Sequence, residues 1–225
     1  MLLLLCPVMV HAEEVADTVT PAPAAPAVQA SQKQLRLGFD ISRIARNVLS
    51  DKVHGYELSA DYYFKKELYF AAEAGFGSST VNYPVLRYNS DNFFVQAGID
   101  KALFPRKRPN DWSLAFVGLR YGVAVVKRGA AAYNTDDGLG NKTSGTIPSD
   151  YFSLHWLELS GGMKLELFRG VFAGWTVRSK FALNQKSVGD LKPEGIAGFG
   201  AAEKNLAFDF NFYISYALRW SGGRK

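Results

Sequence analysis

The chain has 225 residues, a formal net charge of +5 and an aromatic fraction of 14%, with 16 Phe and 11 Tyr. The modest positive charge is spread along the chain and does not form a basic patch, so we expect no nucleic-acid partner. No run approaches the roughly 18 apolar residues of a membrane-spanning helix. The only cysteine, Cys6, lies near the start, so we expect no disulfide. The length fits one β-barrel or sandwich of the larger kind.

The first residues have the features of a leader and a linker. A short apolar run over residues 2–10 is followed by Val-His-Ala, which predicts a signal peptide over residues 1–12 with cleavage after Ala12. Residues 13–32 are rich in Ala, Pro, Thr and Val. This composition cannot bury a core, so it predicts an extended or disordered periplasmic linker.

Alternating apolar and polar residues predict eight β-strands within a barrel domain over residues 33–220. A period of two places successive side chains on opposite faces of a sheet. The predicted strands cover residues 33–42, 55–64, 68–77, 92–100, 112–126, 153–167, 171–183 and 205–220.

The last of these strands has the most regular pattern. One of its faces carries Leu206, Phe208, Phe210, Phe212, Ile214, Tyr216, Leu218 and Trp220. A face of this kind needs an apolar medium along its whole length, and the strand exceeds the five or six residues or so usual in soluble sheets. It is long enough for a tilted membrane-spanning strand, which needs roughly 9–11 residues. We therefore interpret it as the closing strand of a transmembrane β-barrel.

The predicted connections alternate in length. Those after the second and sixth strands are tight (65–67 and 168–170), and that after the fourth is moderate (101–111). Those after the first, third, fifth and seventh strands are long: 43–54, 78–91, 127–152 and 184–204. Outer-membrane barrels have short periplasmic turns and long extracellular loops. With an even number of strands, the pattern predicts an outer-membrane barrel with both termini in the periplasm.

A soluble barrel also alternates, but with its apolar face inward. The composition of the polar face favours the membrane alternative. This face carries Gly38, Gly75, Gly98, Gly118, Gly122, Gly162 and Gly174. A solvent-facing strand gains little from glycines, which weaken strands, whereas the interior of a narrow barrel needs small residues between large ones.

The same face carries charges of both signs. We predict that a lumen charge network consists of Glu73, Arg120, Glu158, Lys164, Arg178 and Lys180. Inside a narrow barrel these groups must pair, because an unpaired buried charge is costly. Eight strands leave room only for side chains, so paired charges that plug the barrel are favoured over a relay or a gated path.

Four segments carry a resemblance to a known family: residues 35–40 (LRLGFD), 55–61 (GYELSAD), 117–122 (VGLRYG) and 155–158 (HWLE). With them, the region 35–220 resembles a small outer-membrane barrel family of the Bacteroidetes that has no established function. The resemblance implies a location and a shape. In size the chain is also similar to the OmpA- and OmpX-type eight-stranded barrels, whose interiors are filled.

The C-terminal strand resembles the assembly signal of outer-membrane barrels, which ends in an aromatic residue. The matching residues are Ile214, Tyr216, Leu218 and Trp220. The resemblance implies that the barrel-assembly machinery is a partner during biogenesis. The chain departs from the pattern because a tail over residues 221–225 follows the aromatic residue.

Basic residues gather at the predicted periplasmic end: Lys65, Lys66, Arg106, Lys107 and Arg108. One interpretation is contact with phospholipid head groups of the inner leaflet of the outer-membrane lipid. The other is docking of an acidic periplasmic or outer-membrane protein partner. The first is favoured.

A catalytic site is not expected. Some eight-stranded outer-membrane barrels modify lipid A with Ser, His and a carboxylate, and Ser153, His155 and Glu158 are a superficial match. By the period of two, Glu158 points to the face opposite the other two, whereas a working triad needs all three within hydrogen-bond reach.

We also expect no cofactor and no metal site. The glycine-rich segment over residues 195–200 has the wrong spacing for a nucleotide fingerprint, and we interpret it as a flexible loop. The sequence therefore predicts a non-enzymatic integral outer-membrane barrel, acting as a structural or accessory subunit of an assembly or secretion complex. The alternative is a surface receptor or adhesin that binds through loops 127–152 and 184–204, and a lipid A-modifying enzyme comes third.

Overall fold

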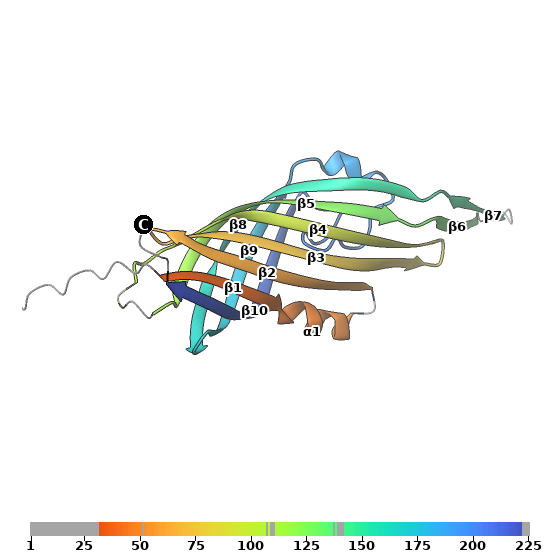
Figure 1. Cartoon of the computed structure of the whole chain (residues 1–225). Coiled ribbons are helices and arrows are strands. Elements are labelled where there is room, and N and C mark those ends of the chain that lie inside the picture. The colour runs from red at the N-terminus through yellow and green to blue at the C-terminus, as the bar shows by residue number, and fades with distance from the viewer. Residues whose placement is uncertain are drawn as a thin grey trace, which may run out of the picture. The chain divides into compact units, whose positions relative to one another are not determined.

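The computed structural model describes residues 32–50, 52–106, 108, 111–136, 138 and 142–221 (Figure 1). The predicted signal peptide, the linker up to residue 31, Lys107 and residues 222–225 lie outside the described residues. The barrel strands are β1 (Gln32–Asp40), β2 (Val53–Lys65), β3 (Leu68–Tyr83), β4 (Leu86–Ala102), β5 (Leu114–Arg128), β8 (Asp150–Phe168), β9 (Val171–Ala182) and β10 (Leu206–Ser221).

These strands form a closed antiparallel barrel. Each pairs with its neighbour along the chain, and β1 also pairs with β10, from Gln32 opposite Ser221 to Asp40 opposite Tyr213. The strands β6 (Ala131–Asp136) and β7 (Lys142–Ile147) form a separate hairpin between β5 and β8. The predicted eight-stranded antiparallel up-and-down barrel is confirmed.

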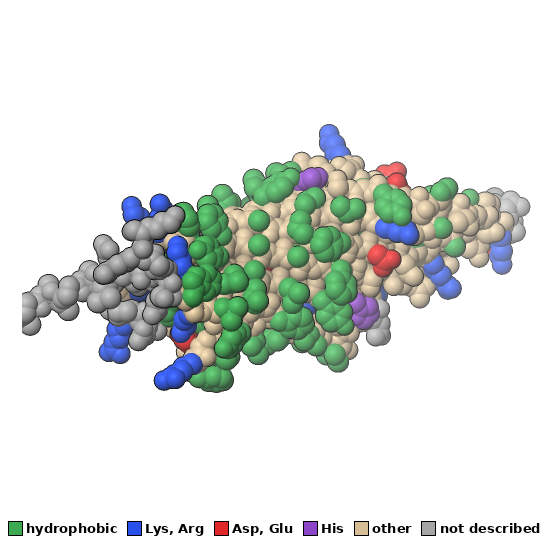
Figure 2. Space-filling model, viewed as in Figure 1, with side chains coloured by type: hydrophobic (Ala, Val, Ile, Leu, Met, Phe, Trp, Pro, Cys, Tyr) green, Lys and Arg blue, Asp and Glu red, His purple; other side chains and the backbone are tan. Residues whose placement is uncertain are grey.

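The apolar face of the strands points outward. On β10, Phe208 is 71% exposed and Ile214 is 51% exposed, whereas Asn211 between them is fully buried. Figure 2 shows hydrophobic side chains spread over the outer surface of the strands. Among the described residues, no helix has both the length and the hydropathy to cross a membrane.

The two ends of the barrel differ, and we name them by their connections. The turn end carries the β2–β3, β4–β5 and β8–β9 connections. The mouth end carries helix α1 (Ile41–Leu49), the β3–β4 turn, the β6–β7 hairpin and the β9–β10 loop with the short helix η1 (Gln185–Val188). The long connections therefore gather at one end, as the sequence predicted.

The prediction of a long loop over residues 78–91 is wrong. The β3–β4 ladder continues to Tyr83 opposite Leu86, which leaves a connection of only Pro84 and Val85. Main-chain hydrogen bonds hold a ladder together without apolar side chains, so the strands continue after the alternation ends. The β6–β7 hairpin likewise replaces much of the predicted loop 127–152 and pairs with β4 through Leu86 and Arg87.

The prediction of a loop over residues 43–54 is also partly wrong, because most of this segment belongs to helix α1. The first strand ends at Asp40 rather than residue 42, and the Asp40 side chain accepts a hydrogen bond from the Ser42 amide at 2.8 Å. An Asp in this position satisfies a free amide of the first helical turn and starts the helix.

Candidate functional site

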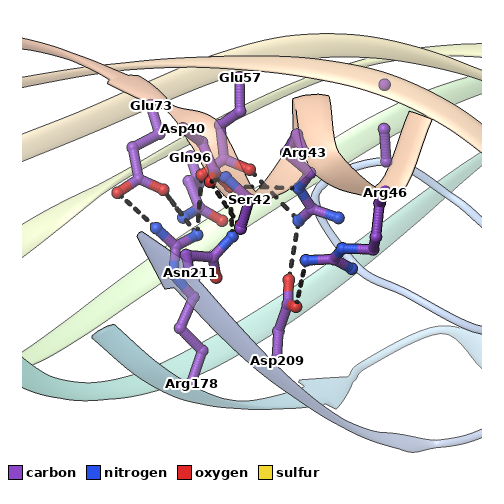
Figure 3. A network of polar contacts seen from close by, with 12 residues as sticks. Asp40, Ser42, Arg43, Arg46, Glu57, Glu73, Gln96, Arg178, Asp209 and Asn211 are labelled. Atoms are coloured by element: carbon purple, nitrogen blue, oxygen red, sulfur yellow. Dashed lines mark hydrogen bonds and ion pairs between the residues drawn. The ribbon is translucent and has the colours of Figure 1, made fainter. Parts of the chain in front are cut away.

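Two arginines organise the middle of the interior. Arg178 Nη1 lies 2.7 Å from Glu73 Oε2 and 3.1 Å from Glu57 Oε1. Arg120 Nη1 lies 2.6 Å from Glu73 Oε1 and 3.4 Å from Glu158 Oε1. All five side chains are buried, and Figure 3 shows Arg178, Glu73 and Glu57 within this network. Every carboxylate of the group therefore faces a guanidinium, which a buried charge requires.

The two predicted lysines of the network lie on either side of this group. Lys164 Nζ is 2.8 Å from Asp61 Oδ2 and 3.6 Å from Asp100 Oδ2. Lys180 Nζ is 3.1 Å from Asp209 Oδ2. The structure thus brings all six predicted residues into one polar interior, in which the two lysines pair with aspartates rather than with the central glutamates.

The network contains further charged residues that the prediction left out. They are Arg36, Asp40, Arg43, Glu57, Asp61, Asp100 and Asp209. All except Arg43 lie on the inward face of a strand, so the period of two could have identified them as members of the network. Arg43 belongs to α1, for which a strand pattern gives no signal.

An apolar plug closes the interior at the mouth. The β9–β10 loop folds back so that Ile196 and Phe199 are buried against Phe94 and Trp156. The Phe199 and Trp156 ring centroids are 5.9 Å apart. The interpretation of residues 195–200 as a flexible loop is wrong, because this segment packs into the barrel.

The plug is also bonded to the part of β4 that extends beyond the β4–β5 ladder, which begins at Ser90. Tyr88 on β4 donates its hydroxyl hydrogen to the carbonyl of Lys192 in the β9–β10 loop at 2.5 Å. Burial raises the pKa of Tyr88. The hydroxyl therefore stays protonated, and remains a donor, throughout the physiological pH range.

Aromatic rings and arginines close the turn end. Trp112 is buried and meets Tyr63 edge to face, with ring centroids 5.5 Å apart. The Arg106 guanidinium carbon lies 4.0 Å from the Trp112 ring centroid and 4.4 Å from that of Tyr63, and Arg106 Nε lies 3.4 Å from Glu67 Oε1. Arg106 was predicted to be part of a basic surface, but its guanidinium packs against both rings, because a guanidinium is attracted to aromatic faces.

The remaining described residues of the predicted basic end are exposed. Lys65 and Lys66 lie at the β2–β3 turn, and Arg108 lies in the β4–β5 connection. Their side chains leave a positive surface at the turn end, smaller than the sequence predicted.

The residues of the predicted assembly signal lie on the outward face of β10. Ile214, Tyr216, Leu218 and Trp220 are all exposed, and the Trp220 ring stacks near Tyr62 with centroids 6.3 Å apart. This part of β10 pairs with β1, so these residues line the closing junction of the barrel.

Ser153 and His155 lie on the outer face with Tyr121. His155 Nε2 is 3.3 Å from Ser153 Oγ, and His155 Nδ1 is 2.6 Å from the Tyr121 hydroxyl. Glu158 is buried in the interior and makes no contact with this group. The arrangement lacks the carboxylate that orients the histidine and stabilises its imidazolium form in Ser-His-Asp enzymes. Within the described residues, no cluster of three or more His, Cys, Asp and Glu side chains is arranged to hold a metal ion.

Comparisons with known proteins give a family and two distant structures. The family model described as "Domain of unknown function (DUF6048)" matches residues 1–220. Two solved structures are similar to this chain. Ail, the attachment invasion locus protein of Yersinia pestis, crystallised with the heparin analogue sucrose octasulfate, has 10% identity and a TM-score of 0.37 over 84% of this chain and 98% of its own.

The second structure is Neisserial surface protein A, which has 13% identity and a TM-score of 0.29 over 84% of this chain and 96% of its own. No curated protein sequence matches the chain. At such TM-scores the two structures carry no inference about function, and the barrel assignment follows from the strand pairing.

Proposed function

We propose that this chain, which belongs to the family described as "Domain of unknown function (DUF6048)", is a non-enzymatic barrel of the outer membrane with periplasmic termini. One observation carries the membrane location: paired charges fill the interior, whereas apolar side chains cover the outer surface. A protein surrounded by water has the opposite arrangement and rarely exposes a continuous apolar patch of more than several hundred Å². In a lipid environment, exposed apolar side chains contact hydrocarbon instead of water, so such a surface is stable there.

The filled interior supports a role without transport. The polar network lies between the mouth plug, built around Phe94, Trp156 and Phe199, and the aromatic cluster at Trp112. An eight-stranded barrel is just wide enough for its side chains to fill it. The surfaces left for function are therefore the outer wall and the two ends.

We propose that the protein is a structural or accessory subunit of an assembly or secretion complex, contacted at the turn end. Lys65, Lys66 and Arg108 are exposed there and supply the positive charge that an acidic protein partner needs. Head groups of the inner leaflet would use the same charges. The outward face of the closing strand would be read by the barrel-assembly machinery during biogenesis.

A second candidate is a receptor or adhesin, which the β6–β7 hairpin favours. Among the described strands, β7 pairs only with β6, so its other edge is open (Figure 1). An open edge can accept an extended peptide as an additional strand. The predicted binding loop 184–204 supports this candidate less, because part of it is buried in the mouth.

Co-purification from detergent-solubilised membranes tests the two candidates. The variant Lys65→Glu/Lys66→Glu/Arg108→Glu should lose the proteins that co-purify with the wild type, and a variant lacking residues 132–146 should keep them. Recovery of the wild-type protein alone would count against the subunit role. Loss of partners only in the hairpin deletion would favour the receptor. Recovery of folded protein in the soluble fraction without detergent would refute the membrane location itself.

A further inference from the structure

The wall of the barrel is incomplete at the mouth end. The β1–β10 ladder stops at Asp40 opposite Tyr213, and the β1–β2 ladder stops at Phe39 opposite Leu58. Both neighbours continue, so β2 residues 53–57 and β10 residues 206–212 have no β1 partner. Helix α1 occupies this gap and contacts both strands (Figure 1). We call α1 with these two strand edges the seam.

Side chains replace the missing ladder at the seam. The Asn47 carboxamide donates to the Gly55 carbonyl at 2.9 Å and accepts from the Gly55 amide at 2.8 Å. On the other edge, the Phe210 amide donates to Asp209 Oδ1 at 3.0 Å, and Arg43 Nη2 lies 2.7 Å from Asp209 Oδ2. Main-chain groups within a membrane must find partners inside the protein. The polar face of α1 therefore serves as part of the wall (Figure 3).

The opposite face of α1 is apolar and uncovered. Ile41, Ile44, Val48 and Leu49 are spaced as one helical face, and their exposure rises from 39% to 86% along the helix. The outward side chains of the flanking strands continue this surface: Tyr56, Leu58, Phe208, Phe210 and Phe212. The apolar belt of the barrel thus passes over α1 without a break, and hydrocarbon chains that cover the belt would cover the helix as well.

A cavity of about 250 Å³ lies between α1 and the β9–β10 loop. Its lining includes Arg43, Arg46, Asn47 and His54, with Glu194 as the carboxylate among the lining residues. Ligand pockets usually measure roughly 300–1,000 Å³, so this space suits a small polar head group. Its arginines favour an anion.

The two arginines of the lining differ in their availability. The side chain of Arg43 is 13% exposed and lies within 3.4 Å of three carboxylates, those of Asp40, Glu57 and Asp209. The side chain of Arg46 is 47% exposed and makes one ion pair among the described residues, with Asp209 at 3.0 Å. A guanidinium has five N–H donors, so Arg46 retains the capacity to bind a phosphate.

We propose that the seam is a binding site for one anionic phospholipid-type amphiphile. Its hydrocarbon chains lie on the apolar face of α1, and its phosphate binds Arg46 at the edge of the cavity. This proposal rests on the proposed membrane location and adds a specific lipid site to it. The observation that carries it is the juxtaposition, on one short helix, of an uncovered apolar face and a partly exposed arginine.

Fluorescence quenching in vesicles tests the site. A fluorophore is attached at Val48→Cys in the full chain with Cys6→Ser, and the protein is reconstituted in phosphatidylcholine. Brominated phosphatidylglycerol should quench the label with about fivefold higher apparent affinity than brominated phosphatidylcholine. This is the preference expected when one arginine meets a lipid of net negative charge, because the choline cation of the zwitterionic lipid offsets its phosphate. Arg46→Gln should bring the ratio close to one and leave quenching by both lipids intact. Arg46→Lys should restore most of the preference.

A second label distinguishes failure of the site from failure of the proposed location. Leu119→Cys lies on the outward face of β5, and there the two lipids should quench equally. Equal quenching by the two brominated lipids at Val48→Cys, with Arg46 in place, would overturn the anion site. Quenching at Leu119→Cys without quenching at Val48→Cys would overturn it as well, while the barrel would still be a membrane protein. Absence of quenching at both positions would refute the membrane location.

Discussion

Glu73 binds both central arginines: its Oε2 lies 2.7 Å from Arg178 Nη1 and its Oε1 lies 2.6 Å from Arg120 Nη1. The three side chains come from β3, β5 and β9, so one carboxylate joins strands from different sides of the barrel. Its removal leaves two buried guanidinium groups short of negative charge.

Glu73→Ala should therefore destabilise the barrel by about 3–5 kcal/mol, the usual cost of breaking a buried ion pair by removing one partner. Urea unfolding in detergent micelles, followed by tryptophan fluorescence, measures this. Glu194→Ala is the matched control, because its only ion pair among the described residues is exposed and 3.9 Å long, so its loss should cost less than about 1 kcal/mol. Equal midpoints for the two variants would contradict a central role for Glu73.

Asn47→Leu should loosen the seam, because the leucine has a similar volume but cannot bond the Gly55 main chain. The Gly55 amide donates to Asn47 in the native barrel, so its hydrogen exchange should become faster. The cost in stability should be about 1–3 kcal/mol, because main-chain groups lose their partners.

Mass-spectrometric hydrogen exchange of a peptide covering residues 53–57 gives the readout. Leu49→Ala serves as the control, since this side chain points outward and is 86% exposed. Unchanged exchange in Asn47→Leu would mean that α1 does not protect the β2 edge.

Gly122→Ala should destabilise the barrel by about 1–3 kcal/mol through overpacking. A Cβ atom at this position would collide with the indole ring of Trp156 in the mouth plug. At Gly161 the nearest atom to an added Cβ is the Phe116 carbonyl oxygen at 3.7 Å, an ordinary contact. Gly161→Ala should therefore stay within about 0.5 kcal/mol of the wild type. Thermal unfolding of the two variants side by side checks the difference, and equal losses would argue against the plug.

Overproduction of the protein should leave the mass spectrum of lipid A unchanged, and His155→Ala should make no difference. The reason is that His155 contacts Ser153 and the Tyr121 hydroxyl, while the Glu158 carboxylate lies inside the barrel. A mass shift in lipid A that disappears in His155→Ala would establish an enzyme and would refute the non-enzymatic proposal.

The alternation of side chains was enough to predict the barrel and the two faces of its strands. Phe210 and Asn211 lie on opposite faces because a strand places successive residues on opposite sides. The glycines and charges on the polar face then indicated that this face is the inward one. The same rule placed Arg120 and Glu158 on one face, although it did not say which partners they would find.

Only the tertiary structure decided the seam, the mouth plug and the full length of β3 and β4. Arg43 and Asp209 are 166 residues apart, and they meet because the barrel closes β10 onto β1. The nine residues of α1 are too few for a helical period to stand out beside a strand pattern, and the β3–β4 ladder continues where the alternation ends. The local sequence governs where a side chain points, whereas closure of the barrel governs which distant group it meets.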